Sequence, residues 1–539
     1  MAAADLHANG LHDRGEAAPA ASVRFDASSP VRHIALMLDP SRLRLAHREL
    51  ARRLVNDAGL AVSVVMARAE RPAPPSLELL LGLERLVHRV TDPRLTDRVE
   101  LRDLGLPTHS QAPDLTVDLC GTDTVARAGR TVRVLYDGMP GEIFLVGALA
   151  AGRVPMIEIE DVASGAVLAG GTPGADNAAT LLDAFDCVLA RVVTLVMALV
   201  RASAPLGPAR HATPRALRWR DIVAFEAKSL AQAIVHRLYT LCFHTPHWRT
   251  CWRFLDGPDL WQTQSLAGTA WNVLPDPGFR FYADPFPFVH DGNTFLFVED
   301  FDHRRQKGVI SVVPFDARGP SGPAEPVLEE PWHLSYPFVF AHAGEVWMIP
   351  ESSASRTVTL YRAQKFPYLW QREDILIADV QASDATLVQT DGRFWMFAAT
   401  RDDAGSWSDT LSIFFAPQLQ GPWRPHRANP VLVDQAAARP AGAMIFRDGQ
   451  LWRPVQDCTE GYGTGIGLAE VTRLTPDVFE QRTHTVLRTE PGWPGRRLHT
   501  LNRAGSLECI DGAAYAPRSR FLARRLETWS GRREPSCAP

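Results

Sequence analysis

The sequence predicts a multidomain protein in which an α/β domain precedes an all-β, five-bladed propeller. A chain of 539 residues is too long for a single compact core. Short apolar runs alternate with helical patterns over residues 31–205, whereas helical patterns nearly vanish from residue 269 onward. The second half also repeats itself, with turn glycines at 292, 344, 392, 449 and 505. These glycines lie 48 to 57 residues apart, and repeats of this length are typical of propeller blades.

The N-terminal part is predicted to hold a sheet with crossover helices. Residues 1–30 have the composition of a disordered leader, and the domain is expected over residues 31–205. Strand patterns occupy residues 31–38, 60–67, 114–120, 131–138 and 154–161, and helical patterns occupy 41–59 and 141–152. Strands that alternate with helices favour a parallel sheet.

A helical connector is predicted over residues 206–268, because residues 221–242 form a long amphipathic pattern. The most apolar run of the chain, residues 187–200, precedes it and contains Arg191. About 20 apolar residues are needed to cross a bilayer, so this shorter run predicts a buried helix and no transmembrane segment.

Four strands per repeat are predicted for the propeller, which we place at residues 269–515. Each repeat opens with a hairpin, at residues 283–300, 335–352, 383–400, 439–457 and 498–512, and the first four hairpins are followed by two more strand patterns. The fifth repeat shows only its hairpin. We therefore expect upstream strands, such as residues 269–275, to complete the fifth blade, because an open ring would leave unpaired edges. Residues 516–539 read as a basic, flexible tail.

Polar residues stand where the innermost strands of the blades begin. These are Asp284, Tyr336, Asp384, Arg439 and His499, and the ends of the second strands add Glu299, Glu351, Arg401 and Asp457. In a propeller such positions converge on the central channel, and burying them is costly unless a ligand compensates. A polar ligand site is therefore predicted. The alternative is that Arg439, Asp284 and Asp384 neutralise one another in a closed channel.

Composition excludes several classes of protein. A net charge of −4 gives no reason to expect nucleic-acid binding. The seven cysteines are scattered without a C-x-x-C pair, which argues against disulfides and zinc and favours a reducing compartment. The first residues lack the apolar core of a signal peptide. We expect a cytoplasmic protein without metal or cofactor; its oligomeric state stays open.

Three motifs carry a family resemblance. ADPF at 283–286, SDATL at 383–387 and LQGPWRPHRANPVL at 419–432 resemble five-bladed furanosidase-type glycoside hydrolases, the arabinanases and β-xylosidases. Residues 269–512 resemble more closely the propeller module at the N-terminus of plant glucosamine inositolphosphorylceramide transferase. The resemblance to the hydrolases implies that Asp284 is a general base and that Asp384 tunes its pKa. The fourth blade begins RPAGAM and lacks the glutamate of those enzymes, so Glu351, or else Asp457, is the expected acid.

The N-terminal region resembles the formyltransferase fold, and bacterial proteins join such a domain to this propeller module. The resemblance rests on residues 114–121 and 136–171 and implies a Rossmann-like domain. Formyltransferases use an Asn, a His and an Asp, and no Asn-x-His motif occurs in residues 31–205. A glycine-rich dinucleotide motif is also missing after the first strand.

The sequence thus predicts a carbohydrate-active protein that transfers or hydrolyses a glycosyl group on a glycan or glycolipid. Asp284, Asp384 and Glu351 are the expected catalytic residues. The expected substrate-binding residues are Tyr336, Glu299, Arg439, Asp457, His499 and Arg401. Two alternatives stay open, namely a non-catalytic glycan-binding or scaffold protein, and formyltransferase-like group transfer by the N-terminal domain.

Overall fold

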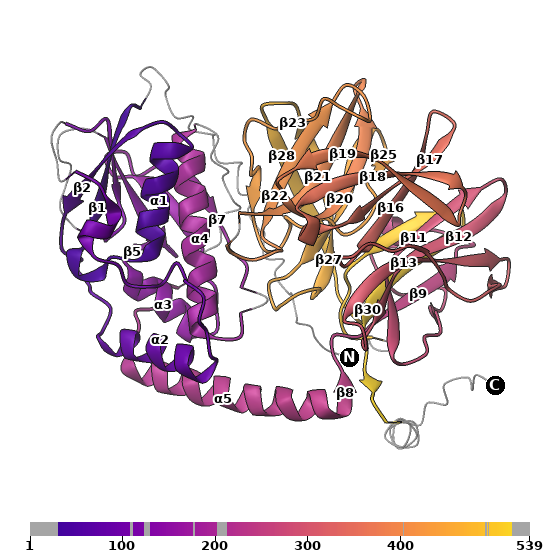
Figure 1. The fold of residues 1–539 in the computed structure, drawn as a ribbon, viewed down its shortest axis with the longest axis horizontal. Helices are drawn as coiled ribbons and strands as arrows, with labels where there is room; N and C mark the ends of the chain where they lie inside the picture. Colours follow the sequence, from indigo (N-terminus) through magenta and orange to yellow (C-terminus); the bar gives the residue numbers. More distant parts are fainter. Residues whose placement is uncertain are drawn as a thin grey trace, which may run out of the picture.

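The computed structural model places an α/β domain beside a five-bladed propeller, with one long helix running beneath both (Figure 1). It describes residues 31–107, 112–122, 130–175, 178–201, 213–402, 404–490, 493 and 495–519. The predicted leader and most of the predicted basic tail lie outside the described residues.

The α/β domain is built on one mixed sheet. Its elements are β1 (His33–Leu38), α1 (Leu45–Asn56), β2 (Ala61–Met66), α2 (Ser76–Val87), β3 (Leu115–Asp118), β4 (Arg130–Tyr136), β5 (Met139–Pro140), α3 (Glu142–Ala150), β6 (Ile157–Asp161), β7 (Val167–Gly171) and α4 (Leu181–Val200). Strands pair in the order β2-β1-β3-β4-β6-β7. The first four are parallel, whereas β6 and β7 are antiparallel, so the predicted parallel sheet is confirmed only in part.

Helix α4 is the predicted buried helix, and it packs against α1, α2, α3 and β7. Leu181, Phe185, Val188 and Leu195 along it have no exposed surface. Burial on all sides explains why its sequence is almost uniformly apolar.

Five antiparallel sheets form the blades of the propeller. The first four are β11 (Arg280–His290) to β15 (Glu325–Leu328), β16 (Ser335–His342) to β19 (Leu369–Ala378), β20 (Gln381–Thr390) to β24 (Leu432–Val433), and β25 (Ile445–Arg447) to β28 (Phe479–Leu487). Between them lie β12 (Asn293–Asp302), β13 (Lys307–Asp316), β14 (Gly319–Pro320), β17 (Glu345–Glu351), β18 (Thr357–Lys365), β21 (Arg393–Arg401), β22 (Thr410–Ala416), β23 (Arg424–Pro425), β26 (Gln450–Asp457) and β27 (Gly465–Leu474). The predicted five-bladed propeller is confirmed.

The fifth blade closes the ring with strands from both ends of the propeller sequence. Its order is β10 (Asn272–Val273), β9 (Trp248–Phe254), β30 (Leu507–Ala513) and β29 (Leu501–Ala504). Strand β10 lies in the upstream segment expected to complete this blade. Strand β9, however, lies inside the predicted connector, 206–268. It pairs with β30 along its whole length and so covers the edge that a two-stranded blade would expose. The connector boundary at residue 268 is thus corrected, and the propeller begins near Trp248.

Helix α5 (Trp219–Cys242) is the connecting helix. It starts under the α/β domain and ends at the propeller, where β8 (Phe243–His244) pairs with β31 (Ala516–Pro517) (Figure 1). The first residues of the predicted flexible tail, from 516, are therefore held by this pairing.

The two domains touch where the second strands of blades three and four end. Thr172, just after β7, exchanges backbone hydrogen bonds with Val433 and Gln435 at 3.0 Å each. Arg191 on α4 reaches Asp409 with nitrogen–oxygen distances of 2.7 and 2.8 Å. Because the inner strands begin at this same end of the propeller, the α/β domain borders the end that carries the predicted site.

Candidate functional site at the start of the inner strands

A β-bulge that repeats in the first three blades aims one side chain of each toward the channel. The register between first and second strands shifts at Ala283/Phe286, Ser335/Phe338 and Ser383/Thr386. The residue inside each bulge is in the left-handed region, with φ of 48° for Asp284, 44° for Tyr336 and 55° for Asp384. That conformation is unfavourable for residues other than glycine, and strained residues gather at functional sites.

The bulged residues and their neighbours bond across the blades. Tyr336 donates from its backbone N–H to Asp284 at 3.1 Å, and its hydroxyl lies 2.8 Å from Thr386. The backbone N–H of Gly442, at the start of blade four, donates to the same hydroxyl at 2.8 Å. Tyr336 is fully buried, so it joins blades and does not face a ligand.

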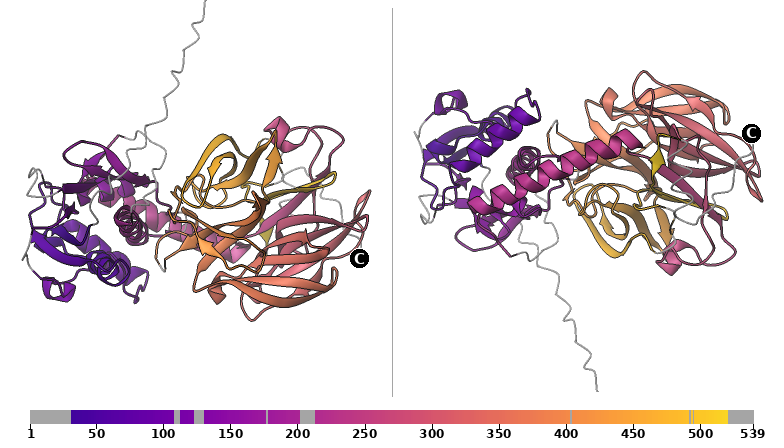
Figure 2. Two further views of the ribbon diagram at one scale, coloured as in Figure 1. Left: turned by 90° about the horizontal axis from the view of Figure 1, so that it is seen from above. Right: turned by 90° about the horizontal axis from the view of Figure 1, so that it is seen from below.

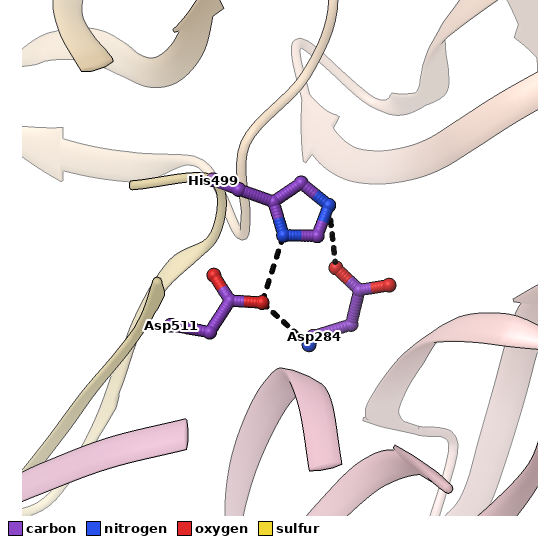
Figure 3. A group of neighbouring side chains, drawn as sticks. All are labelled: Asp284, His499 and Asp511. Atoms are coloured by element: carbon purple, nitrogen blue, oxygen red, sulfur yellow. Dashed lines mark hydrogen bonds and ion pairs between the residues drawn. The ribbon is translucent and has the colours of Figure 1, made fainter. Parts of the chain in front are cut away.

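Asp284 lies in a cluster with His499 and Asp511 (Figure 3). His499 has Nδ1 2.7 Å from Asp511 and Nε2 3.4 Å from Asp284, and the backbone N–H of Asp284 donates to Asp511 at 2.9 Å. Thr500 donates its hydroxyl to Asp284 at 2.6 Å. Burial lowers the pKa of His499, but the carboxylates of Asp511 and Asp284 outweigh it and raise that pKa to about 10.

These three side chains could share a cation by proximity, since their ligand atoms lie within 4.8 Å of one another. A protonated imidazole donates from both nitrogens, however, and has no lone pair for a metal. With a carboxylate at each ring nitrogen, the residues as they stand form an ion-paired network around a protonated His499.

Asp384 is held by a second network. Arg439 donates to its two oxygens at 2.5 and 3.4 Å, and Gln456 donates to it at 2.9 Å. Glu351 accepts the backbone N–H of Asp384 at 3.2 Å and lies 3.7 Å from Arg439. Arg439 therefore contacts Asp384 and Glu351, whereas Asp284 is paired with His499. A single neutralised triad of Arg439 with both aspartates is not what forms.

Carboxyl groups outnumber cations in this cluster. The two cations are Arg439 and His499, and five carboxyl groups surround them, namely those of Asp284, Glu299, Glu351, Asp384 and Asp511. Burial, then the charge of Asp511, raises the pKa of Asp284 to about 6, against the opposing charge of His499. Burial likewise raises the pKa of Asp384 to about 7, against Arg439. Burial and then the Asp284 carboxylate raise the pKa of Glu299 well above its ordinary value.

Solvent reaches only the rim of the cluster. The side chains of Glu299, Arg439 and Glu351 are 9%, 9% and 11% exposed, whereas that of Asp284 is 4% exposed. His333, 39% exposed, lies 3.4 Å from Glu299. Glu299, Glu351 and Arg439 are therefore the groups that an incoming ligand meets first.

Two predicted residues lie apart from this cluster. Asp457 accepts hydrogen bonds from Thr459 and from Arg488, the latter at 2.7 Å, so it holds the turn after β26. Arg401 donates to the Gly405 carbonyl and lies 4.7 Å from the Trp407 ring centre, in the loop that faces the α/β domain. The contacts of Asp457 and Arg401 thus lie in loops beside the cluster, and their predicted part in substrate binding stays a prediction.

Sequence reasoning missed Asp511, Gln456 and Trp248. Trp248 stacks on His499 with ring centres 4.6 Å apart, and Tyr462 places its ring 4.9 Å from the Arg439 guanidinium. Asp511 could have been found from the sequence, because it faces Thr500 in the last predicted hairpin. In the structure Thr500 donates its backbone N–H to Asp511 at 2.7 Å. Nothing in the sequence indicated Trp248, since it lies far upstream in the predicted connector.

A cavity of about 630 Å³ lies between the domains beside this end of the propeller. Its walls include Phe225, Ser229 and Gln232 of α5, Thr172 of the α/β domain, and the loop from Cys458 to Gly461. Tyr462, which contacts Arg439 and His499, follows that loop directly. The cavity thus adjoins the polar cluster through one turn of chain.

The raised pKa of His499 makes stability depend on pH. A folded-state pKa of about 10 against 6.5 means that the folded protein binds the extra proton between these values. The contribution of His499 is fully present below pH 6.5 and is lost as the pH rises through 10, by up to about tenfold in the folding equilibrium per pH unit. In urea unfolding from pH 6.5 to 10, we expect His499→Gln to be less stable at pH 6.5 and to lose less stability on going to pH 10.

The matched control is His484→Gln, whose imidazole is paired with Glu470 at the propeller surface. It should keep the wild-type slope. Equal slopes for wild type and His499→Gln would contradict the ion-paired assignment.

The fold and site define a five-bladed propeller with a polar cluster at the start of its inner strands. The family of the N-terminal part of glucosamine inositolphosphorylceramide transferase 1 matches residues 273–509, which are the propeller. The transferase 1 of Oryza sativa subsp. japonica is 34% identical over 232 residues, covering 41% of this chain and 31% of that protein. That of Arabidopsis thaliana is 32% identical over 229 residues, covering 41% and 30%. The chain thus matches less than a third of the length of these relatives.

Solved structures show more distant likeness. The RS223 β-xylosidase has a TM-score of 0.33 and 10% identity, covering 44% of this chain and 93% of that one. The GH43_1 enzyme from Xanthomonas citri has a TM-score of 0.32 and 12% identity, covering 43% and 87%. Likeness at this level carries no argument about activity.

Proposed function

We propose that the propeller is a carbohydrate-active module that transfers or hydrolyses a glycosyl group on a glycan or glycolipid. The observation that carries the proposal is the buried pair Asp284 and Glu299, which lie on the paired strands β11 and β12 and whose carboxyl groups both have raised pKa values. The pKa of Asp284 is about 6, so it is mostly ionised at neutral pH, whereas that of Glu299 lies well above its ordinary value. Glycosyl chemistry needs one carboxylate and one carboxylic acid.

In this proposal Asp284 is the general base and Glu299 is the general acid. Sequence reasoning expected Glu351 as the acid. Glu351, however, accepts the Asp384 backbone N–H and lies 3.7 Å from Arg439, so its contacts hold the second network together. The Asp384 carboxylate, anchored by Arg439, adds to the raised pKa of Asp284. Glu299, on the second strand of the first blade, thereby takes the place of the glutamate that the fourth blade lacks.

The similarity to glucosamine inositolphosphorylceramide transferases supports the class of ligand. The name of those relatives contains both a sugar, glucosamine, and an inositol-containing lipid. We extend only the class, a sugar-bearing ligand, to this chain.

A non-catalytic glycan-binding protein is the second candidate. The observation that favours it is burial, because the side chains of Asp284 and Asp384 are only 4% and 1% exposed. In that case Glu299, Glu351 and Arg439 form a polar rim that binds a sugar without reaching Asp284.

Ligand binding is the first test. A thermal-shift screen of the full chain would use glycans, nucleotide sugars and folate derivatives. A ligand at 100 times its dissociation constant stabilises by about 2.7 kcal/mol, which moves the midpoint by several degrees. We expect a sugar to stabilise the wild type but not Glu351→Gln/Arg439→Gln. The control is Asp374→Asn/Asp391→Asn, which removes two exposed acids elsewhere on the propeller.

Each outcome decides between the candidates. A sugar that stabilises the wild type and the control alone places the ligand at the polar rim. Turnover of that sugar by the wild type and its loss in Asp284→Asn supports catalysis, whereas binding without turnover supports the second candidate. Stabilisation by a folate in all variants would move the function to the α/β domain. No response to any sugar would overturn carbohydrate binding.

For the α/β domain we propose a formyltransferase-like origin without formyl transfer. Its parallel order β2-β1-β3-β4 supports the relationship. The carboxylate of Asp118, at the end of β3, already accepts backbone N–H groups of Cys120, Gly121 and Thr122 and the Arg133 guanidinium. These contacts give Asp118 a structural role in the turn after β3.

A further inference from the structure

Helix α5 exposes a large apolar surface. The exposed side chains are Trp219, Val223, Leu230, Ile234, Val235, Leu238 and Leu241, with exposed fractions between 55% and 70%. Ile222 is the single buried residue of the helix. In the view from below, α5 crosses in front of both domains with no other described element over it (Figure 2, right). Monomeric proteins rarely leave such a patch uncovered.

Helix α2 extends this surface. It lies against α5 and exposes Leu79, Leu83, Leu86 and Val87 by 49% to 77%. We call the exposed apolar side chains of these two helices the α2–α5 face. Along α5 the residues Val223, Leu230, Ile234 and Leu241 recur at spacings of seven and four, which places them on one side of the helix.

The exposed charges of α2 and α5 are basic. They are Arg220 and Arg237, together with Lys228, which borders the cavity between the domains. The acids of the same helices are buried, partly buried or paired: Glu84 is buried beneath α4, Glu226 is partly buried, Glu78 is paired with Arg44, and Asp221 is paired with Arg215. An apolar stripe bordered by basic residues is the pattern of helices that lie in the interface of an anionic membrane.

A second copy of the chain fits this face less well. A helical pair needs an uninterrupted apolar seam at alternating spacings of three and four. On α5 the seam through Val223, Leu230, Ile234 and Leu241 is completed by Ala227 and Arg237, so a charged residue breaks it and a small one leaves it thin. Among the described residues, no helix is long and apolar enough to cross a bilayer. The pattern therefore favours lying on a membrane over spanning it.

We propose that the α2–α5 face docks the protein on the surface of an anionic lipid bilayer. The two helices lie along the interface with their apolar side chains at the boundary between headgroups and acyl chains, and Arg220 and Arg237 contact anionic headgroups. The opposite side of α5, at Phe225 and Ser229, lines the cavity between the domains. Docking places that cavity directly behind the membrane surface. The inference does not rest on the proposed function.

Vesicle co-sedimentation of the full chain tests the proposal. The probes are phosphatidylcholine vesicles with and without one third phosphatidylglycerol, neither of which carries a sugar-bearing lipid, so the result is separate from glycan binding. We expect binding to the anionic vesicles that weakens at high salt. Leu230→Glu/Ile234→Glu should weaken it at least about tenfold, because two apolar anchors become charged. Removing each basic residue, as in Arg237→Gln, should weaken it about fivefold.

The control is Leu369→Glu/Phe446→Glu, which alters two propeller residues that are 57% and 55% exposed. It should bind like the wild type. Slower hydrogen exchange in residues 219–242 of the wild type on anionic vesicles provides a readout that needs no variant.

Three results would overturn the proposal. The first is a wild type that stays in the supernatant with both kinds of vesicle. The second is equal loss of binding in the propeller control. The third is a dimer in solution that Leu230→Glu/Ile234→Glu converts to a monomer without any vesicle binding, which would assign the face to a second copy.

Discussion

Replacing Asp409 with alanine is expected to destabilise the protein by about 3–5 kcal/mol, the cost of leaving one buried charge without its partner. The partner is Arg191 of α4, and the two side chains are 1% and 0% exposed. Asp409 also accepts the backbone N–H of Gly174 at 2.8 Å, so it bonds to the α/β domain at two places. Chemical unfolding followed by fluorescence would measure the loss.

The matched control lies in the same interface. Asp402 pairs with Arg53 at 3.2 Å, but its side chain is 55% exposed. Asp402→Asn should cost about 0–1 kcal/mol, because water screens the pair. The double variant Arg191→Met/Asp409→Leu should recover much of the loss, since an apolar pair leaves no buried charge. If Asp409→Ala and Asp402→Asn cost the same, the buried pair does not hold the two domains together.

Arg191 shows what sequence patterns miss in this chain. Its position in the apolar run of residues 187–200 ruled against a membrane span, but nothing local indicated why a guanidinium should be there. The reason is Asp409, 218 residues further along. Helix and strand patterns arise from neighbours in sequence, whereas charge pairs between domains depend on docking that no periodicity records.

The propeller was predictable because its repeats are local. Hairpin glycines such as Gly292, with φ of 74°, recur in every blade, and the ADPF and SYPF motifs mark the bulges that aim Asp284 and Tyr336. The boundary at residue 268 was wrong because β9 pairs with β30, more than 250 residues away. Ring closure joins distant segments, and the sequence of β9 alone does not identify its partner.

The site was predictable in position but not in chemistry. The convergence of Asp284, Asp384 and Arg439 follows from repeat geometry, and the structure brings them to one end of the inner strands. Which carboxyl keeps its proton depends on burial and on the surrounding charges. The burial and charges depend on Glu299 of the first blade and on His499 and Asp511 of the fifth, and the order of these residues in the chain does not rank their proton affinities.

Glu299 makes the strongest case for chemistry at this site, and replacing it should raise stability while removing activity. In the folded protein its pKa lies well above the ordinary value of 4.5, because of burial and then the Asp284 carboxylate. Above pH 4.5, folding therefore favours the uptake of a proton that the unfolded chain has lost. This cost begins near pH 4.5 and grows as the pH rises toward the folded-state pKa. Glu299→Gln resembles the protonated form and escapes that cost.

We therefore expect Glu299→Gln to be more stable than the wild type at pH 7, with a difference that disappears near pH 4.5 in urea unfolding. Turnover of any sugar found by the ligand screen should fall about 10²–10⁴-fold, the usual contribution of a general acid, with substrate affinity preserved. The contrasting variant is Glu351→Gln, which weakens the contact with Arg439 and should lower stability. A gain of stability with loss of turnover is the behaviour of a strained catalytic carboxyl. Loss of stability in both variants would instead identify Glu299 as a structural carboxylate and leave the propeller as a binding module.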